Sequence, residues 1–225
     1  MEQGSAIDLR KIHKLDRPAR VIVLMASSMG GTKVLYDLLP LFDDAEGLGI
    51  VIVQHMPKEF TGSFSERLNN VTGFDLKEAQ DGDRICAGKA LLAPGGLHLI
   101  IEKGKMGWYR VKTMEGPPVK GVKPAADVLF ASAAASVNIP IVAVVLTGMG
   151  SDGADGVAQL KKNEALVITQ TEETCSVYGM PRAVVERGLS DASLPVEEIP
   201  EYIKRKKGSL KRRITHPVDE FRIGL

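Results

Sequence analysis

The fold is decided by residues 21–31, Val-Ile-Val-Leu-Met-Ala-Ser-Ser-Met-Gly-Gly. The first six residues form a short, continuously apolar run, which is typical of a strand buried on both faces of a parallel sheet. The serines and glycines that follow end this strand, and apolar residues then recur at helical spacing over residues 30–42. This segment therefore predicts a strand, a sharp turn and a helix, the repeating unit of an α/β fold.

The same alternation continues outward along the chain. Further apolar strands are predicted at 49–54, 140–146 and 165–169. Helical patterns are predicted at 60–71, 124–136, 153–163 and 181–187. No long polar linker interrupts these elements, so we expect one α/β domain.

The middle third has a different pattern. Short segments are separated by Asp-Gly, Pro-Gly-Gly and Lys-Gly turns, which are typical of β-hairpins; they lie at 75–79, 89–93, 97–102 and 107–113. We expect this region to extend the sheet and to make it mixed. The predicted fold class is a doubly wound α/β fold, with a mostly parallel sheet, helices on both faces and a β-hairpin extension.

The composition excludes several classes of protein. The chain has 225 residues, 44% hydrophobic and 25% charged, which is close to a typical globular protein. Its two cysteines are too few for a disulfide framework, and no apolar run reaches the roughly 18–20 residues of a membrane helix. Membrane-spanning, secreted, collagen-like and disordered classes are therefore not expected, and the expected location is the cytoplasm.

The net charge of +1 is unevenly distributed. Residues 1–20 are predicted to be an N-terminal arm with a charge of +2, residues 21–203 a catalytic domain with −7, and residues 204–225 a basic C-terminal tail with +6. The sequence KRKKGSLKRR at 204–213 is either a solvated end or an electrostatic docking segment for acidic helices or an anionic membrane. Nucleic-acid binding is not expected, because the acidic body would repel phosphates.

Polar side chains follow three of the predicted strands. Ser28 follows the first strand, His55 the second and Asp152 the third. Ligands of open parallel sheets bind beyond the carboxyl ends of the strands, so these side chains are candidates for one site. In an activated-serine site the imidazole takes the serine proton and the carboxylate fixes the tautomer. We therefore take Ser28, His55 and Asp152 as the candidate catalytic residues.

Structural readings of the same residues remain open. Ser28 lies in an Ala26-Ser-Ser-Met-Gly30 turn that resembles a nucleophile elbow, in which the Met29 amide is the candidate oxyanion donor. The alternative is that the serine simply caps the helix. His55 could be a structural histidine, and His98 in the hairpin region competes for the role of base. His13 and His216 lie in the tails and are weak candidates. The dispersed histidines and cysteines give no metal-ligand spacing, so neither metal nor cofactor is expected.

The segment Gly148-Met-Gly-Ser-Asp-Gly153 supports a different function. It matches G-x-G-x-x-G after a strand and before a helix, and Glu172 and Glu173 lie about 20 residues further on, as in a dinucleotide site. Two features weaken this alternative: the motif comes late in the chain, and Asp152 would repel a pyrophosphate.

A fourth cluster follows the last predicted strand at 175–181. Cys175 shows no sign of activation and is expected to be a buried, inert thiol. Tyr178 and Met180 either shape a substrate slot or simply pack. With Met29 and Met149, they are the candidate oxyanion and substrate-binding residues.

Together these segments resemble the catalytic domain of the CheB family of protein-glutamate methylesterases. The resemblance covers about 21–203 and rests on seven ordered motifs: Ser28-Met-Gly-Gly-Thr, Gln54-His-Met-Pro-Lys-Glu-Phe-Thr-Gly-Ser-Phe, Ala93-Pro-Gly-Gly-Leu-His, Gly116-Pro-Pro-Val, Asp127-Val-Leu-Phe, Leu146-Thr-Gly-Met-Gly-Ser-Asp-Gly-Ala and Cys175-Ser-Val-Tyr-Gly-Met-Pro-Arg.

The resemblance implies hydrolysis of γ-glutamyl methyl esters on the cytoplasmic helices of methylated chemoreceptors in chemotaxis adaptation, with glutamine deamidation in some members. It implies that Ser28 is the nucleophile, His55 the general acid/base and Asp152 its orienting carboxylate. Under this reading, the glycines of 148–153 present Asp152 to His55.

Two departures from the family pattern matter. Met29 replaces a threonine that could help polarise the site, so a catalytically weakened esterase fold that acts as a binding protein is a further alternative. Family members also carry an N-terminal receiver domain of about 120 residues, and the twenty residues before the first strand are too few for one. We therefore expect a catalytic domain without a receiver domain, either truncated or regulated in another way.

Overall fold

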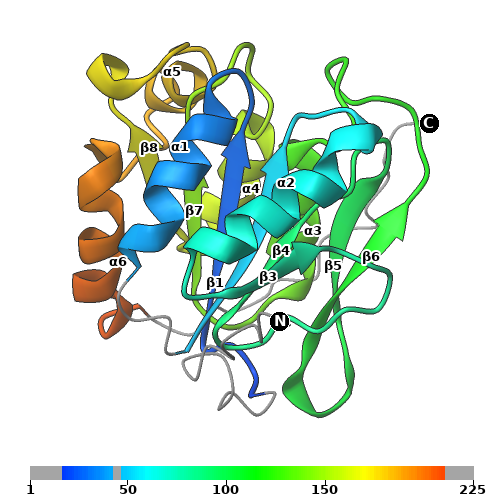
Figure 1. The fold of residues 1–225 in the computed structure, drawn as a ribbon. Helices are drawn as coiled ribbons and strands as arrows, with labels where there is room; N and C mark the ends of the chain where they lie inside the picture. Colours follow the sequence, from blue (N-terminus) through cyan, green and yellow to red (C-terminus); the bar gives the residue numbers. More distant parts are fainter. Residues whose placement is uncertain (1–16, 43–46, 211–225) are drawn as a thin grey trace, which may run out of the picture.

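The computed structural model describes residues 17–42 and 47–210. A seven-stranded sheet forms the centre, and its strand order is β3-β4-β2-β1-β7-β8-β9 (Figure 1). The strands are β1 (Val21–Ser27), β2 (Leu48–Gln54), β3 (Asp75–Glu78), β4 (Lys89–Leu92), β7 (Ile141–Val145), β8 (Leu166–Gln170) and β9 (Ala192–Leu194). After β4 the chain crosses to the other half of the sheet, where β7 pairs with β1 on the side opposite to β2. The carboxyl ends of β2, β1 and β7 therefore lie side by side at one edge.

Every residue of β1, β2 and β7 is buried, as their continuous apolar sequences predict. All neighbouring strands of this sheet pair in parallel. The sheet itself is therefore wholly parallel rather than mixed, and the doubly wound α/β class is confirmed.

Helices cover both faces, and each face has its own hydrophobic core. Alternate residues of β1 point into the two cores on opposite faces of the sheet. Val23 and Met25 pack with α1, α2 and α6, whereas Leu24 and Ala26 pack with α3, α4 and α5. The helices are α1 (Gly31–Leu38), α2 (Lys58–Val71), α3 (Ala126–Ser136), α4 (Ala154–Lys162), α5 (Met180–Val185) and α6 (Ile199–Lys207). None of the helices within the described ranges is long and apolar enough to cross a membrane.

The hairpin prediction was right for only half of the middle region. β5 (His98–Lys103) and β6 (Tyr109–Met114) form a separate antiparallel pair. The earlier two segments became β3 and β4, parallel neighbours in the main sheet. The Asp-Gly turn at 81–82 belongs to a ten-residue connection between them, and the Gly82 and Ile85 amides of this connection bond to β6 carbonyls. A connection of that length allows the crossover that parallel strands need.

The hairpin packs against α3 at the right of the molecule (Figure 1). The Ile101 amide donates to Ser132 Oγ at 2.9 Å, and the Tyr109 hydroxyl bonds to Asn138. These contacts fix the position of α3, whose N-terminus reaches the candidate site.

The ends of the described chain pack on the body. Ala19 is buried, and Pro18 bridges to Cys86. At the other end, residues 204–207 form the end of α6, where Arg205 and Lys206 lie over the Tyr202 ring. Residues 1–16 and 211–225 of the predicted arm and tail, with His13 and His216, lie outside the described residues.

Candidate active site

Ser28 lies in the tight turn between β1 and α1. Its amide donates to Thr147 O at 3.0 Å, and its carbonyl accepts from Gly31 N at 2.8 Å. Gly30 has φ +81°, a conformation that glycine adopts without strain, and a Cβ there would lie 2.5 Å from Ser176 Oγ. The half-buried Ser28 is therefore held at the edge of the sheet, and its Oγ has no hydrogen-bond partner among the described residues.

His55 follows β2 at the same edge. The β1–β2 register pairs Ser27 with Gln54, so Ser28 and His55 are the next residues on two strands about 4.8 Å apart. The His55 amide donates to Ser27 O at 3.0 Å, and Nε2 lies 2.8 Å from Asp152 Oδ2. Because Nε2 is engaged by the carboxylate, Nδ1 is the ring nitrogen left for Ser28.

Asp152 is 3% exposed and is held by three donors. Its Oδ2 accepts from His55 and from Ala126 N at 2.6 Å, and its Oδ1 accepts from Asp127 N at 3.0 Å. Burial alone would raise the pKa of Asp152, but the hydrogen bonds from His55 and from the two amides outweigh burial and lower the pKa below its usual value. The carboxylate is therefore ionised at neutral pH, as an orienting group for an imidazole must be.

Gln54 joins the backbone of the two neighbouring segments. It is 2% exposed, and its Nε2 donates to Ser28 O at 2.9 Å and to His55 O at 3.0 Å. Its Oε1 accepts from the Ser27 hydroxyl at 2.7 Å. One buried amide thus fixes the backbone on which both candidate catalytic side chains stand, a role that the sequence did not reveal.

The ion pair between Asp127 and Lys120 is a second support of the site that the sequence did not predict. Lys120 Nζ lies 2.7 Å from Asp127 Oδ2 and 2.6 Å from Asp155 Oδ2, and it donates to Ser151 O at 3.2 Å. Burial raises the pKa of Asp127, the Asp152 charge raises it further, and Lys120 opposes both. The network ties the loop after β6 to the loop that carries Asp152. The Gly116-Pro-Pro-Val and Asp127-Val-Leu-Phe motifs marked this region in the sequence, but neither pointed to Lys120.

The four candidate substrate-binding residues divide into two pairs. Met29 and Met149 are 57% and 68% exposed, so both lie at the solvent-facing rim. Met180 is buried, and Tyr178 bridges to Gly148. A Cβ on Gly148 would lie 2.3 Å from Met180 Sδ and 2.8 Å from Ser28 Cβ, so Met180 packs close beside the serine.

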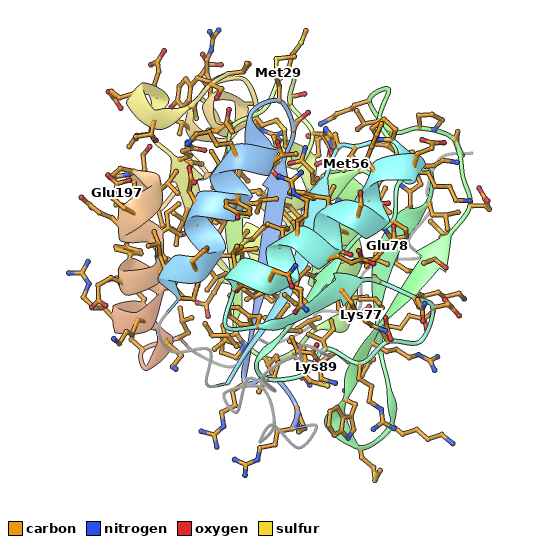
Figure 2. The ribbon with its side chains drawn as sticks, in the orientation of Figure 1. Met29, Met56, Lys77, Glu78, Lys89 and Glu197 are labelled. Carbon is orange, nitrogen blue, oxygen red and sulfur yellow. The ribbon has the colours of Figure 1, made fainter. Side chains whose placement is uncertain are left out.

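Met29 keeps a backbone N–H group that can donate to an oxyanion. Its carbonyl accepts from Thr147 Oγ1 at 3.0 Å, and its N–H makes no hydrogen bond within the described part of the chain. Figure 2 shows the Met29 side chain directed out of the turn at the top of the molecule. The thioether therefore does not block the amide.

His98 is not placed to compete as a base. It is buried, its Nε2 lies 3.0 Å from Pro117 O, and its Nδ1 accepts from Ala125 N at 3.2 Å. Both ring nitrogens are therefore used to hold loops. Cys175 is half-buried rather than buried, and desolvation raises the pKa of its thiol to about 11, which disfavours the reactive thiolate.

The glycine motif does not form a phosphate cradle. Asp152 turns its carboxylate toward α3 and His55, and Asp127 Oδ1 accepts from Gly156 N at 2.8 Å in the first turn of α4. The Asp127 carboxylate thus accepts the hydrogen bond of the Gly156 amide, which a pyrophosphate at this helix N-terminus would need. Gly150 and Gly153 instead adopt φ +86° and +95°, which allow the turn that presents Asp152.

The parallel sheet and this set of side chains define a doubly wound α/β protein with a serine, a histidine and an aspartate at neighbouring strand ends. Residues 23–203 match the family model described as CheB methylesterase. The chain belongs to this family.

Known relatives agree. The chain is 42% identical over 206 residues to a protein-glutamate methylesterase/protein-glutamine glutaminase of Pyrococcus abyssi, covering 89% of the chain and 56% of the relative. It is 44% identical over 185 residues to a Bdellovibrio bacteriovorus protein of the same description, covering 82% and 52%. The chain thus spans about half the length of these curated relatives.

A solved structure gives the same result. The crystal structure of the Thermotoga maritima CheB methylesterase catalytic domain matches with a TM-score of 0.77 and 36% sequence identity. The match covers 82% of this chain and 97% of that domain.

Proposed function

We propose that this protein is a serine esterase that hydrolyses γ-glutamyl methyl esters in proteins, with residues 21–203 as the catalytic domain. Ser28 Oγ attacks the ester carbonyl while His55 Nδ1 takes its proton. The Met29 amide stabilises the oxyanion, and His55 returns the proton to the departing methoxide, which leaves as methanol. Water activated by His55 then hydrolyses the acyl-serine and releases the glutamate.

The observation that carries this proposal is the 2.8 Å bond between His55 Nε2 and Asp152 Oδ2 beside Ser28. Asp152 is held by two backbone amides and accepts from Nε2, so it favours the tautomer whose Nδ1 can accept the serine proton. The names of the relatives support the ester as substrate.

The same site has the groups needed to deamidate glutamine side chains. The relatives' full description also includes a protein-glutamine glutaminase. Ammonia then takes the place of methanol as the leaving group. We assign the substrate to the cytoplasmic helices of methylated chemoreceptors, and hence the reaction to the cytoplasm. Docking of the basic segment 204–213 to such acidic helices remains part of this proposal.

Methanol release from methylated receptor membranes tests the function, with Ser28→Ala compared against Ser27→Ala. The first variant should lower kcat by at least about 10⁴-fold, since loss of a nucleophile removes the covalent route. Ser27 supports the site only through its hydrogen bond to Gln54, so its variant should lose far less of the rate than Ser28→Ala does. Full activity in Ser28→Ala would remove the assignment of the nucleophile.

The alternative of an inactive esterase fold that acts as a binding protein rests on Met29. The Met29 side chain is exposed, and its N–H has no hydrogen-bond acceptor within the described residues, so this amide can still donate to an oxyanion, which favours an active enzyme. Labelling of Ser28 by a fluorophosphonate distinguishes the two, because only an activated serine reacts.

A further inference from the structure

A groove between α1 and α2 begins beside the candidate active site. It has a volume of about 430 Å³ and is lined by Thr32, Lys33, Tyr36, Met56, Phe60, Ser63, Phe64 and Arg67. Met56 directly follows His55 in the chain, and the exposed Met29 lies between Ser28 and the start of α1. Figure 2 shows Met29 and Met56 toward the upper ends of these two helices. The groove therefore runs from the edge that carries the candidate catalytic residues along the outer face.

Large apolar side chains are exposed along this path. Phe60 is 58% exposed, Met29 57% and Tyr36 42%. Phe60 and Tyr36 line the groove itself, whereas Met29 lies just before α1 in the chain. Single exposed apolar residues are ordinary, but exposed aromatic side chains that face one groove are typical of an interaction surface. On α2 the lining positions 60, 63, 64 and 67 follow helical spacing and form one stripe about 10 Å long. Such a stripe fits about two turns of a partner helix.

The charged residues that line the groove in the described part of the chain are cationic. They are Lys33 and Arg67, and none of the described carboxylates lines it. Lys33 pairs with Asp37 at 2.5 Å, but that pair is exposed and weak in water. By contrast, the groove beside α6 mixes Glu197 and Glu201 with lysines. The α1–α2 groove thus favours a partner with apolar and anionic side chains.

We propose that the α1–α2 groove binds the helix that carries the methyl ester, a glutamate-rich amphipathic helix of the substrate protein. This inference rests on the proposed esterase function. Apolar residues of the substrate helix pack on Phe60 and Tyr36, and its unmethylated glutamates face Lys33 and Arg67. The esterified side chain then reaches past Met29 and Met56 to Ser28. The groove selects the protein substrate, whereas the serine site selects the ester.

The test uses two probes: a glutamate-rich amphipathic helical peptide with one γ-glutamyl methyl ester, and a small N-acetyl-glutamate γ-methyl ester amide. Fluorescence anisotropy measures peptide binding to Ser28→Ala protein, where no turnover occurs. Adding Phe60→Ala or Arg67→Glu should each raise the peptide Kd about tenfold, as for a central interface residue. Hydrolysis of the small ester by the same variants with Ser28 intact should stay within about twofold, since the small ester lacks the helix that the groove binds.

Matched controls are Met106→Ala and Arg182→Glu, exposed residues on the hairpin and on α5. These should leave the peptide Kd unchanged. Unchanged peptide affinity in both groove variants would overturn the proposal, as would dimerisation of the protein through Phe60. Failure of the intact protein to hydrolyse both the esterified peptide and the small ester would instead reject the proposed esterase function, since peptide binding is measured separately.

Discussion

The Gln54 amide offers the sharpest test of how the site is built. Its Nε2 faces two carbonyl oxygens, Ser28 O and His55 O, at 2.9 and 3.0 Å. Gln54→Glu keeps the shape of the side chain and replaces that NH₂ by an oxygen. An ionised carboxylate would face two acceptors in a buried position, so the variant must fold with its carboxyl protonated. A protonated carboxyl has one hydrogen and satisfies only one of the two carbonyls.

The loss of stability in Gln54→Glu is the sum of two costs, one for the unsatisfied carbonyl and one for protonating the carboxyl. The unsatisfied buried carbonyl costs about 1–3 kcal/mol. Protonating a carboxyl with an ordinary pKa of about 4.3 costs about 4 kcal/mol at pH 7 and about 1 kcal/mol at pH 5. The variant should therefore lose about 5–7 kcal/mol of stability at pH 7 but only about 2–4 kcal/mol at pH 5.

The sign of the pH dependence follows from the raised folded-state pKa of the new carboxyl. The loss is smallest below the unfolded pKa and grows as pH rises toward the folded pKa. Urea unfolding of the wild type and the variant at pH 5 and pH 7 measures the difference. Since domains have about 5–15 kcal/mol in total, the variant should be marginal at pH 7 and folded at pH 5.

The control is Gln80→Glu, an exposed glutamine whose substitution should change stability by less than about 0.5 kcal/mol at either pH. An equal stability loss for Gln54→Glu at both pH values would refute the reasoning. It would mean that the introduced carboxyl is not forced to take up a proton, and that Nε2 does not face the two carbonyls.

Two further predictions concern Asp152 and its support. Asp152→Asn should lower kcat about 10⁴-fold with little change in KM, because three donors converge on the carboxylate and an amide cannot accept all of them; steady-state ester hydrolysis checks this. Lys120→Met should destabilise the protein by about 1–3 kcal/mol at pH 7, because it leaves the buried Asp127 carboxylate unpaired. That loss should shrink as the pH falls, because burial raises the pKa of Asp127 and the folded protein then takes up a proton there. Urea unfolding at pH 4 and pH 7 checks this, and an equal loss at both pH values would contradict it.

Particular residues show how far sequence reasoning reached. Ser28, His55 and Asp152 were proposed because each follows an apolar strand, and the structure places all three at one edge, with His55 bonded to Asp152. β3 and β4 were misassigned to hairpins, because turn residues mark a change of direction but not the strand that is eventually paired. Gln54 and Lys120 were missed, because their partners are backbone carbonyls and distant carboxylates.

The sequence by itself determined the succession of buried strands, turns and helices and the residues that stand at the strand ends. Those features are local, since burial follows the apolar period and turns follow glycine and polar residues. Only the tertiary structure decided which strands are neighbours, that α3 directs its first amides at Asp152, and that α1 and α2 leave a cationic aromatic groove. These features depend on contacts between segments far apart in the chain. Such contacts are made largely through backbone groups that every residue carries, so no residue type marks them in advance.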